Sequence, residues 1–192
     1  EIHERLVGSE MCIRDRGKTL AEVLKEHPEY LGTKVENGEL PVLVKFIDAK
    51  KDLSVQVHPS DEYAREHEGD NGKTEMWYVI DAKPGAGLYS GFSKQITPAE
   101  YVERIKNNTI TDVLQFHEVK SGDVFFLPAG RIHAICEGIL IAEIQQSSDI
   151  TYRIYDYDRR DAQGNARELH IEQSIDCLLY TSPSPRDAHE SR

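Results

Sequence analysis

Residues 122–133 have the sequence GDVFFLPAGRIH, and this stretch indicates the fold. The run from Asp123 to Leu127 contains the β-branched and aromatic residues that favour a strand. Pro128-Ala129-Gly130 has the residues of a tight turn, after which the chain reaches His133. The stretch therefore predicts a strand that runs into a turn and returns with a histidine close to the turn.

The rest of the chain repeats this alternation of short strands and turns. Residues 19–22 (TLAE) form a capping-box pattern that predicts a short helix, and further short helices are expected over 97–105 and 170–178. Many short strands with few helices predict a mainly β protein, an antiparallel barrel or jelly roll. The expected strands are 42–47, 53–57, 76–80, 123–127, 139–144 and 150–155.

The strand over 53–57 has two chemically different faces. Side chains alternate along a strand, so Ser54, Gln56 and His58 share one face. Val55 and Val57 share the other. A polar face turned inward suits a barrel whose interior is a site, and a polar face turned to solvent explains the pattern equally well.

Three potential metal ligands stand at strand ends near turns. His58, Glu75 and His133 make a set of two histidines and a carboxylate, to which Gln56 could add an amide oxygen. The three cysteines are widely separated and form no C-x-x-C pair, which excludes a cysteine-rich zinc site and suits a reducing compartment.

Several phrases carry a family resemblance. The pattern G-D-x-x-x-x-P-x-G-x-x-H in 122–133 resembles the second signature motif of cupins. VQVHPSDEYA (55–64), GKTEMWYVIDA (72–82), LPAGRIHAI (127–135) and QQSSDITYRIYDYDR (145–159) resemble type I mannose-6-phosphate isomerases of the short bacterial form. The resemblance implies a cupin jelly-roll barrel with a few short helices.

The same resemblance implies a reaction and a set of site residues. The reaction is the interconversion of mannose 6-phosphate and fructose 6-phosphate through an enediol, which requires a cation and a base beside two sugar carbons. Asp149 would either act in the pocket or only orient Arg153, and Glu143 is the candidate base. The implied residues are Gln56, His58, Glu75 and His133 for one zinc ion, Arg153, Glu143, Lys73 and Asp149 for catalysis, and Lys45, Ser54 and Arg159 for the phosphate.

Two other functions fit a cupin. One is a different metal-dependent enzyme, such as a dioxygenase or a cupin phosphoglucose isomerase, but these usually take two ligands from an H-x-H motif that His58-Pro59-Ser60 does not supply. The other is a non-catalytic sugar-binding cupin, which has no need of the complete residue set. The isomerase is therefore the preferred interpretation.

Composition limits the partners. A formal net charge of −11 argues against nucleic-acid binding, which needs a basic surface. No apolar run approaches the roughly 18 to 20 residues that span a bilayer, and no signal-peptide pattern opens the chain. We therefore expect a cytoplasmic protein, a monomer or weak homodimer, that binds a small sugar phosphate and neither nucleic acid nor membrane.

Both ends differ in character from the middle. Residues 1–16 and 179–192 show no clear periodicity, and their runs MCIRDR and LYTSPSPRD resemble translated adaptor sequence. We expect these ends to be non-native or disordered and the catalytic cupin domain to span 17–178. Compared with the family, that domain would lack its first strands, and the second β domain would be absent.

Overall fold

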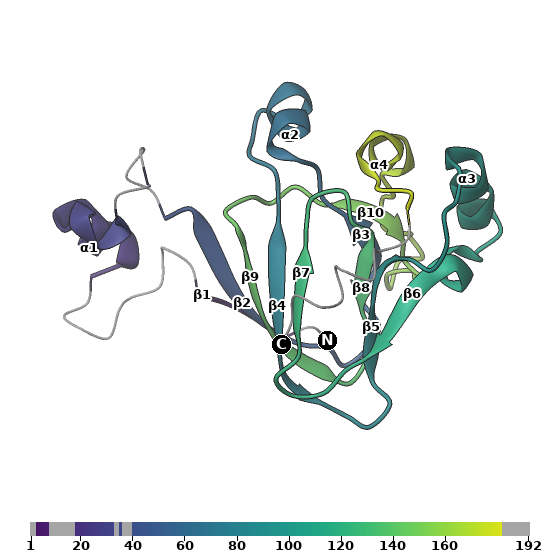
Figure 1. The fold of residues 1–192 in the computed structure, drawn as a ribbon, viewed down its shortest axis with the longest axis horizontal. Helices are drawn as coiled ribbons and strands as arrows, with labels where there is room; N and C mark the ends of the chain where they lie inside the picture. The colour runs from purple at the N-terminus through teal and green to yellow at the C-terminus, as the bar shows by residue number, and fades with distance from the viewer. Residues whose placement is uncertain (1–2, 8–17, 33–34, 36–39, 182–192) are drawn as a thin grey trace.

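The computed structural model describes residues 3–7, 18–32, 35 and 40–181. Two five-stranded antiparallel sheets face each other in this part of the chain (Figure 1). The first sheet has the strand order β1-β2-β9-β4-β7 and the second the order β10-β3-β8-β5-β6. The strands are β1 (His3–Val7), β2 (Val42–Asp48), β3 (Val55–Val57), β4 (Glu75–Ala82), β5 (Gly87–Phe92), β6 (Leu114–Glu118), β7 (Val124–Leu127), β8 (His133–Ile135), β9 (Ile139–Gln146) and β10 (Tyr152–Tyr155).

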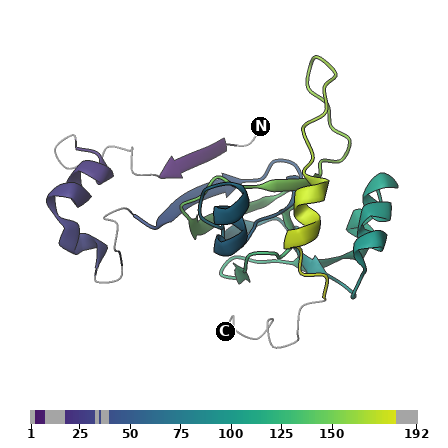
Figure 2. The ribbon, with the colours of Figure 1, turned by 90° about the horizontal axis from the view of Figure 1, so that it is seen from above.

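The helices are short and lie around the sheets. In Figures 1 and 2, α3 and α4 lie beside the second sheet, whereas α1 stands apart from both sheets. None of the helices in the described residues is long and apolar enough to cross a membrane. The helices are α1 (Leu20–Glu26), η1 (Pro28–Leu31), α2 (Asp61–His67), α3 (Pro98–Lys106), η2 (Ile110–Val113) and α4 (Ile171–Cys177).

Side-chain caps explain where two of the three predicted helices begin. The Thr19 hydroxyl accepts a hydrogen bond from the Glu22 amide at 3.2 Å, and the Glu22 carboxylate accepts one from the Thr19 amide at 2.6 Å. This is the capping box predicted for the start of α1. Thr97 caps α3 in a similar way, with Pro98 at the first helical position.

Two hydrophobic clusters hold the strands in place. One lies between the sheets and includes Trp77, Ile141 and Leu88. The other lies on the outer face of the second sheet, where Val57 and Ile154 pack with residues of α3, η2 and α4 such as Tyr101. Because the second cluster draws the apolar residues of β3 outward, the polar residues of that strand face the space between the sheets.

Several elements differ from the sequence prediction. The helix α2 and the strands β5, β6 and β8 were not expected; β5 (GLYSGF) is poor in strand-forming residues, and its pairing with β6 and β8 sets its conformation. His3–Val7 pairs with β2, within the segment 1–16 that we expected to lie outside the fold. The origin of both ends stays a prediction.

Candidate metal centre and surrounding site

The strand β3 and the residue that follows it bring the polar side chains of Gln56 and His58 into the space between the sheets. Val55 and Val57 are fully buried in the outer cluster. Gln56 pairs in register with His133 of β8 and with Arg153 of β10, so these three residues share the inner face. His58 follows directly after the strand and is buried. The polar face therefore turns inward, which is one of the two orientations that the sequence left open.

Three potential ligands from separate strands meet at one point. His58 Nε2 lies 3.2 Å from Glu75 Oε1, and His133 Nε2 lies 3.6 Å from Glu75 Oε2. Ligand atoms of all three residues lie within 4.8 Å of one another, and all three side chains are buried. The turn at Gly130 helps to place them, because its amide donates to the His58 carbonyl at 2.8 Å.

Backbone carbonyls fix the tautomers of both histidines. His58 Nδ1 lies 2.9 Å from the Ile150 carbonyl, and His133 Nδ1 lies 2.8 Å from the Arg131 carbonyl. A carbonyl can only accept, so Nδ1 carries the proton in each ring and Nε2 presents a lone pair to the site. Burial lowers the pKa of His58, and it lowers that of His133 to about 4, so both rings are neutral at pH 7.

The buried ligand atoms of His58, Glu75 and His133 form a site that suits a cation. His58 Nε2 and both oxygens of Glu75 make no hydrogen bond, although Lys73 forms an ion pair with Oε1. The neutral nitrogen lone pairs of the histidines face carboxylate lone pairs. Burial alone would raise the pKa of Glu75, yet interactions with His58, then with His133 and Lys73, lower it. A buried carboxylate with two imidazole nitrogens is a donor set for a divalent transition metal. The Ile150 and Arg131 carbonyls orient the rings as metal-binding histidines require.

Two polar neighbours complete the centre. The Lys73 ammonium is buried and lies 3.2 Å from Glu75 Oε1. The Gln56 side chain lies beside His133, with Nε2 of Gln56 3.3 Å from Nε2 of His133. A metal would require Oε1 of Gln56 in that place, and a half-turn of the amide exchanges the two atoms.

A second buried carboxylate lies on β9, the strand next to that of Glu75 in the first sheet. Glu143 pairs in register with Lys45 of β2 and Trp77 of β4. Trp77 Nε1 donates to Glu143 Oε2 at 2.9 Å, and Lys45 Nζ lies 3.5 Å from Oε1. Burial and the charge of Glu75 raise the pKa of Glu143 to about 7, although Lys73, Lys45 and the indole act in the opposite direction.

Trp77 was not predicted from the sequence as part of the site. Its position two residues after Glu75 puts the two side chains on one face of β4, and this spacing is the signal that could have identified it. Lys45, predicted to hold phosphate, faces Glu143 in the structure. Ser54 is buried two residues before Gln56, in the chain that leads into β3.

Arg153 and Asp149 have different surroundings. The Arg153 guanidinium is half-buried and donates to the Glu168 carbonyl at 3.0 Å. Burial lowers the pKa of Arg153, and neighbouring Arg167 adds to this effect. Asp149 is exposed, and in the described part of the chain no ion pair joins it to Arg153. The expected orienting role of Asp149 therefore has no contact to support it here.

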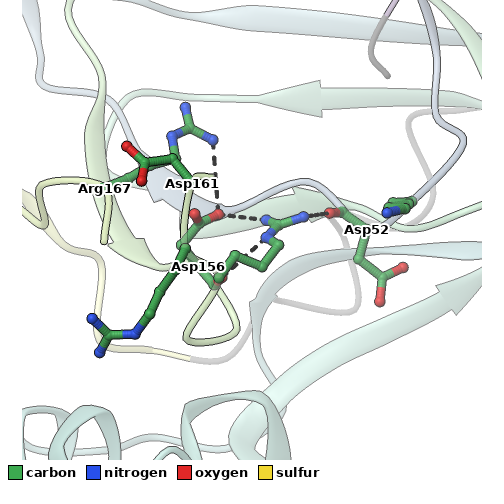
Figure 3. A pocket seen from close by; sticks show the side chains of 7 residues that line it. Asp52, Asp156, Asp161 and Arg167 are labelled. Atoms are coloured by element: carbon green, nitrogen blue, oxygen red, sulfur yellow. Dashed lines mark hydrogen bonds and ion pairs between the residues drawn. The ribbon is translucent and has the colours of Figure 1, made fainter. Parts of the chain in front are cut away.

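Arg159 lies in a separate polar pocket of about 340 Å³ (Figure 3). Its guanidinium donates to the Asp52 carbonyl at 2.6 Å and pairs with Asp156, and it lies over the Tyr157 ring. No residue of the metal centre lines this pocket, whose walls are Lys51, Asp52, Asp156, Arg159, Arg160, Asp161 and Arg167. The structure thus brings together His58, Glu75, His133, Gln56 and Lys73, with Glu143 and Lys45 beside them, and leaves Arg159 and Asp149 apart from that group.

Comparisons with known proteins agree on one family. Residues 3–88 match the sequence model of the type I phosphomannose isomerase catalytic domain. The mannose-6-phosphate isomerase ManA of Bacillus subtilis is 48% identical over 179 residues, which cover 92% of this chain and 56% of that protein. The chain therefore spans about half the length of the curated relatives that it matches.

Solved structures share the fold. The crystal structure of the mannose 6-phosphate isomerase from Bacillus subtilis superposes with a TM-score of 0.78 at 42% identity, covering 87% of this chain and 53% of that one. A zinc-bound mannose 6-phosphate isomerase has a TM-score of 0.67 at 13% identity, covering 94% of this chain and 67% of that one, and this likeness concerns the fold alone. The cupin fold and the family resemblance of the sequence are confirmed, and the chain belongs to the type I phosphomannose isomerase family.

Proposed function

We propose that this chain carries the site of a zinc-dependent isomerase that interconverts mannose 6-phosphate and fructose 6-phosphate through an enediol. The observation that carries the proposal is the convergence of His58 Nε2 with both oxygens of Glu75, all buried and without hydrogen-bond partners. His133 Nε2 faces the same carboxylate. The name of the related mannose-6-phosphate isomerase from Bacillus subtilis supports the same substrate.

One zinc ion fits the ligand set. His58, Glu75 and His133 would hold it, with Gln56 as a fourth ligand once its amide oxygen faces the centre. When bound, zinc supplies Lewis-acid stabilisation for negative charge that develops on the sugar oxygens. The zinc-bound relative of the same fold is consistent with this choice of metal.

The isomerisation moves one proton between two adjacent carbons. Glu143 is the base in this proposal, because its pKa of about 7 lets it take a proton from one carbon and return it to the other. The Trp77 indole donates to Oε2 of Glu143, so in this proposal Oε1, which lies 3.5 Å from the Lys45 ammonium, is the oxygen that transfers the proton. In this proposal Lys73 exchanges a proton with a sugar oxygen, and Arg153 stabilises negative charge through hydrogen bonds.

The phosphate group needs cationic or hydroxyl partners near the same face. Lys45 of β2 pairs in register with Glu143 of β9, and Ser54 lies just before β3, which carries Gln56. These two residues are the nearer candidates. Arg159 is already bonded to Asp156 and the Asp52 carbonyl, so binding phosphate would require it to exchange partners. Asp149 keeps a role only if a bound sugar brings Arg153 towards it.

Metal removal tests the proposal directly. We expect the zinc-loaded chain to convert mannose 6-phosphate to fructose 6-phosphate, and a strong chelator to abolish the conversion because the enediol charge loses its counterion. Added zinc should restore the rate, which a coupled assay for fructose 6-phosphate would measure. Full activity in protein shown to be zinc-free, or none in the zinc-loaded chain, would refute the proposal.

Arg153→Ala separates charge stabilisation from metal binding. Since Arg153 has no contact with His58, Glu75 or His133 that would hold the ligands, zinc content should stay unchanged. Turnover should fall by roughly 10²–10³-fold, as when a donor to a developing oxyanion is removed. Arg104→Ala, which breaks a pair with Glu100 on α3, is the control and should leave turnover intact. Loss of zinc in Arg153→Ala would show a structural role instead.

A further inference from the structure

Gln145 is a buried polar residue that the proposed mechanism does not use. It lies near the end of β9 and pairs in register with Glu75 of β4. Residues opposite each other in a sheet project from the same face, with their Cβ atoms roughly 4.5–5.5 Å apart. Gln145 is 1% exposed and therefore lies inside the molecule, beside a residue of the metal centre.

Two backbone carbonyls determine how the Gln145 amide is oriented. Its Nε2 donates to the Gln146 carbonyl at 3.0 Å and to the Ser148 carbonyl at 2.9 Å. Both partners can only accept, so the atom that faces them must be the NH₂ group. The amide therefore cannot flip without losing both hydrogen bonds, and Oε1 is turned away from these two carbonyls.

That oxygen has no partner. Gln145 Oε1 is buried and accepts no hydrogen bond, which places it among the same unpartnered atoms as His58 Nε2 and the Glu75 oxygens. A buried acceptor without a donor is destabilising by roughly 1–3 kcal/mol, so such atoms are rare in folded proteins. The two hydrogen bonds to the turn after β9 account for the Nε2 group of this amide, but they give no role to its oxygen.

We propose that Gln145 is a further substrate-binding residue, whose Oε1 accepts a hydrogen bond from a hydroxyl group of the bound sugar. This inference rests on the proposed function, because it takes the ligand to be a sugar phosphate. An amide oxygen is a pure acceptor, so it selects a hydroxyl rather than a carbonyl or a phosphate oxygen.

The chemistry of an amide also indicates which hydroxyl it binds. Glu143 and Lys73 exchange protons, whereas an amide oxygen is too weak a base to do so. Gln145 is therefore suited to a hydroxyl that does not react, one on carbon 3, 4 or 5 of the sugar. A site that bonds such a hydroxyl discriminates against sugars that lack it.

This role is tested by removing the Gln145 amide and a sugar hydroxyl, separately and together, and comparing the binding affinities. The probe is mannitol 6-phosphate, which has no carbonyl to isomerise, together with its 3-, 4- and 5-deoxy counterparts. Calorimetry on the zinc-loaded chain should show that the wild type binds one deoxy ligand about tenfold more weakly than the parent. Gln145→Met should lose that preference, binding the parent and this deoxy ligand alike.

The neighbouring glutamine provides a matched control. Gln146 accepts from the Thr74 amide at 2.7 Å and donates to Asp61 at 3.2 Å, on the other face of β9. Gln146→Met should lower the melting temperature but keep the wild-type preference among the four ligands. Should Gln145→Met fail to fold, Gln145→Asn keeps an amide yet withdraws it by one methylene, and it should lose the same preference.

The outcomes distinguish this inference from the function on which it rests. If the zinc-loaded wild type does not bind mannitol 6-phosphate, the proposed function and this inference both fail. If it binds, but the Gln145 variants weaken all four ligands by the same factor, Gln145 only braces the turn and the inference alone is overturned. Loss of preference for a single hydroxyl supports it.

Discussion

Glu75→Gln is expected to lower the zinc affinity of the chain by more than about 100-fold, because even outer-sphere partners of a ligand contribute 10–100-fold. The variant keeps the size of the side chain but removes the negative charge between His58 and His133. A neutral amide is a much poorer ligand for zinc than a carboxylate. Isomerisation should disappear with the metal.

Zinc content after dialysis, together with competition against a chromophoric chelator, would measure this loss. Thermal melting adds a second readout, since a ligand that binds only the folded state stabilises it by about 2.7 kcal/mol at 100 times its dissociation constant. We expect zinc to raise the melting temperature of the wild type and to leave that of Glu75→Gln unchanged. Wild-type zinc affinity in the variant would contradict the assigned metal centre.

Removing Glu75 also leaves the buried Lys73 ammonium without its carboxylate. Breaking a buried ion pair destabilises a protein by about 3–5 kcal/mol, so the melting temperature of the metal-free variant should fall as well. The combination of Lys73→Met with Glu75→Gln removes both charges and should recover part of this stability. It should not recover zinc binding, which separates ligand loss from unfolding.

Glu143→Gln is expected to lower turnover by roughly 10²–10⁴-fold while zinc stays bound, because general base catalysis contributes about this much. The substitution neutralises a buried carboxylate on the strand next to that of Glu75 and leaves His58, Glu75 and His133 unchanged. It is therefore the matched control for Glu75→Gln. Loss of zinc in Glu143→Gln, or an unchanged rate, would remove Glu143 from the mechanism.

The pH dependence of the rate gives a further test of the same residue. A base must be ionised to accept a proton, so the rate should rise with pH through the pKa of Glu143, which lies at about 7 without metal. A bound cation nearby would lower that pKa, so the rise of the rate with pH should be centred at or below pH 7 in the zinc-loaded protein. Any activity that Glu143→Gln retains should not show this rise of the rate with pH.

The ionisation of Glu143 should also affect the folding stability of the metal-free protein. The free energy of unfolding should fall as the pH rises, whereas the reaction rate should increase. The pKa of Glu143 is higher in the folded state than its ordinary value of 4.5, so the unfolded chain releases this proton first as the pH rises. The contribution of Glu143 to the free energy of unfolding is present in full below pH 4.5 and is lost by about pH 7. The free energy of unfolding should therefore fall more over this range in the wild type than in Glu143→Gln.

The sequence predicted local features well where local chemistry is sufficient. The capping box at Thr19 and the proline after Thr97 each mark a helix start that the structure confirms. The alternation in VQV predicted one polar and one apolar face for β3. Such signals depend on residues only a few positions apart, so they survive in the folded molecule.

Other features could not be predicted because they depend on distant partners. The strand β5 has little strand propensity of its own and is defined by pairing with β6 and β8. Trp77 donates to Glu143 across 66 positions of sequence, and no local pattern links the two. The opposite case is Asp149, whose place in the sequence suggested a role although its side chain is exposed.

The sequence by itself determined that the strand around Gln56 has one polar and one apolar face, and it determined which family the chain resembles, because both depend on the order of residues along the chain. Only the tertiary structure decided that His58, Glu75 and His133 meet within 4.8 Å, that Glu143 has a raised pKa, and that the Gln145 oxygen has no partner. These properties arise from burial and from charges on neighbouring strands. They therefore exist only once the two sheets have packed together.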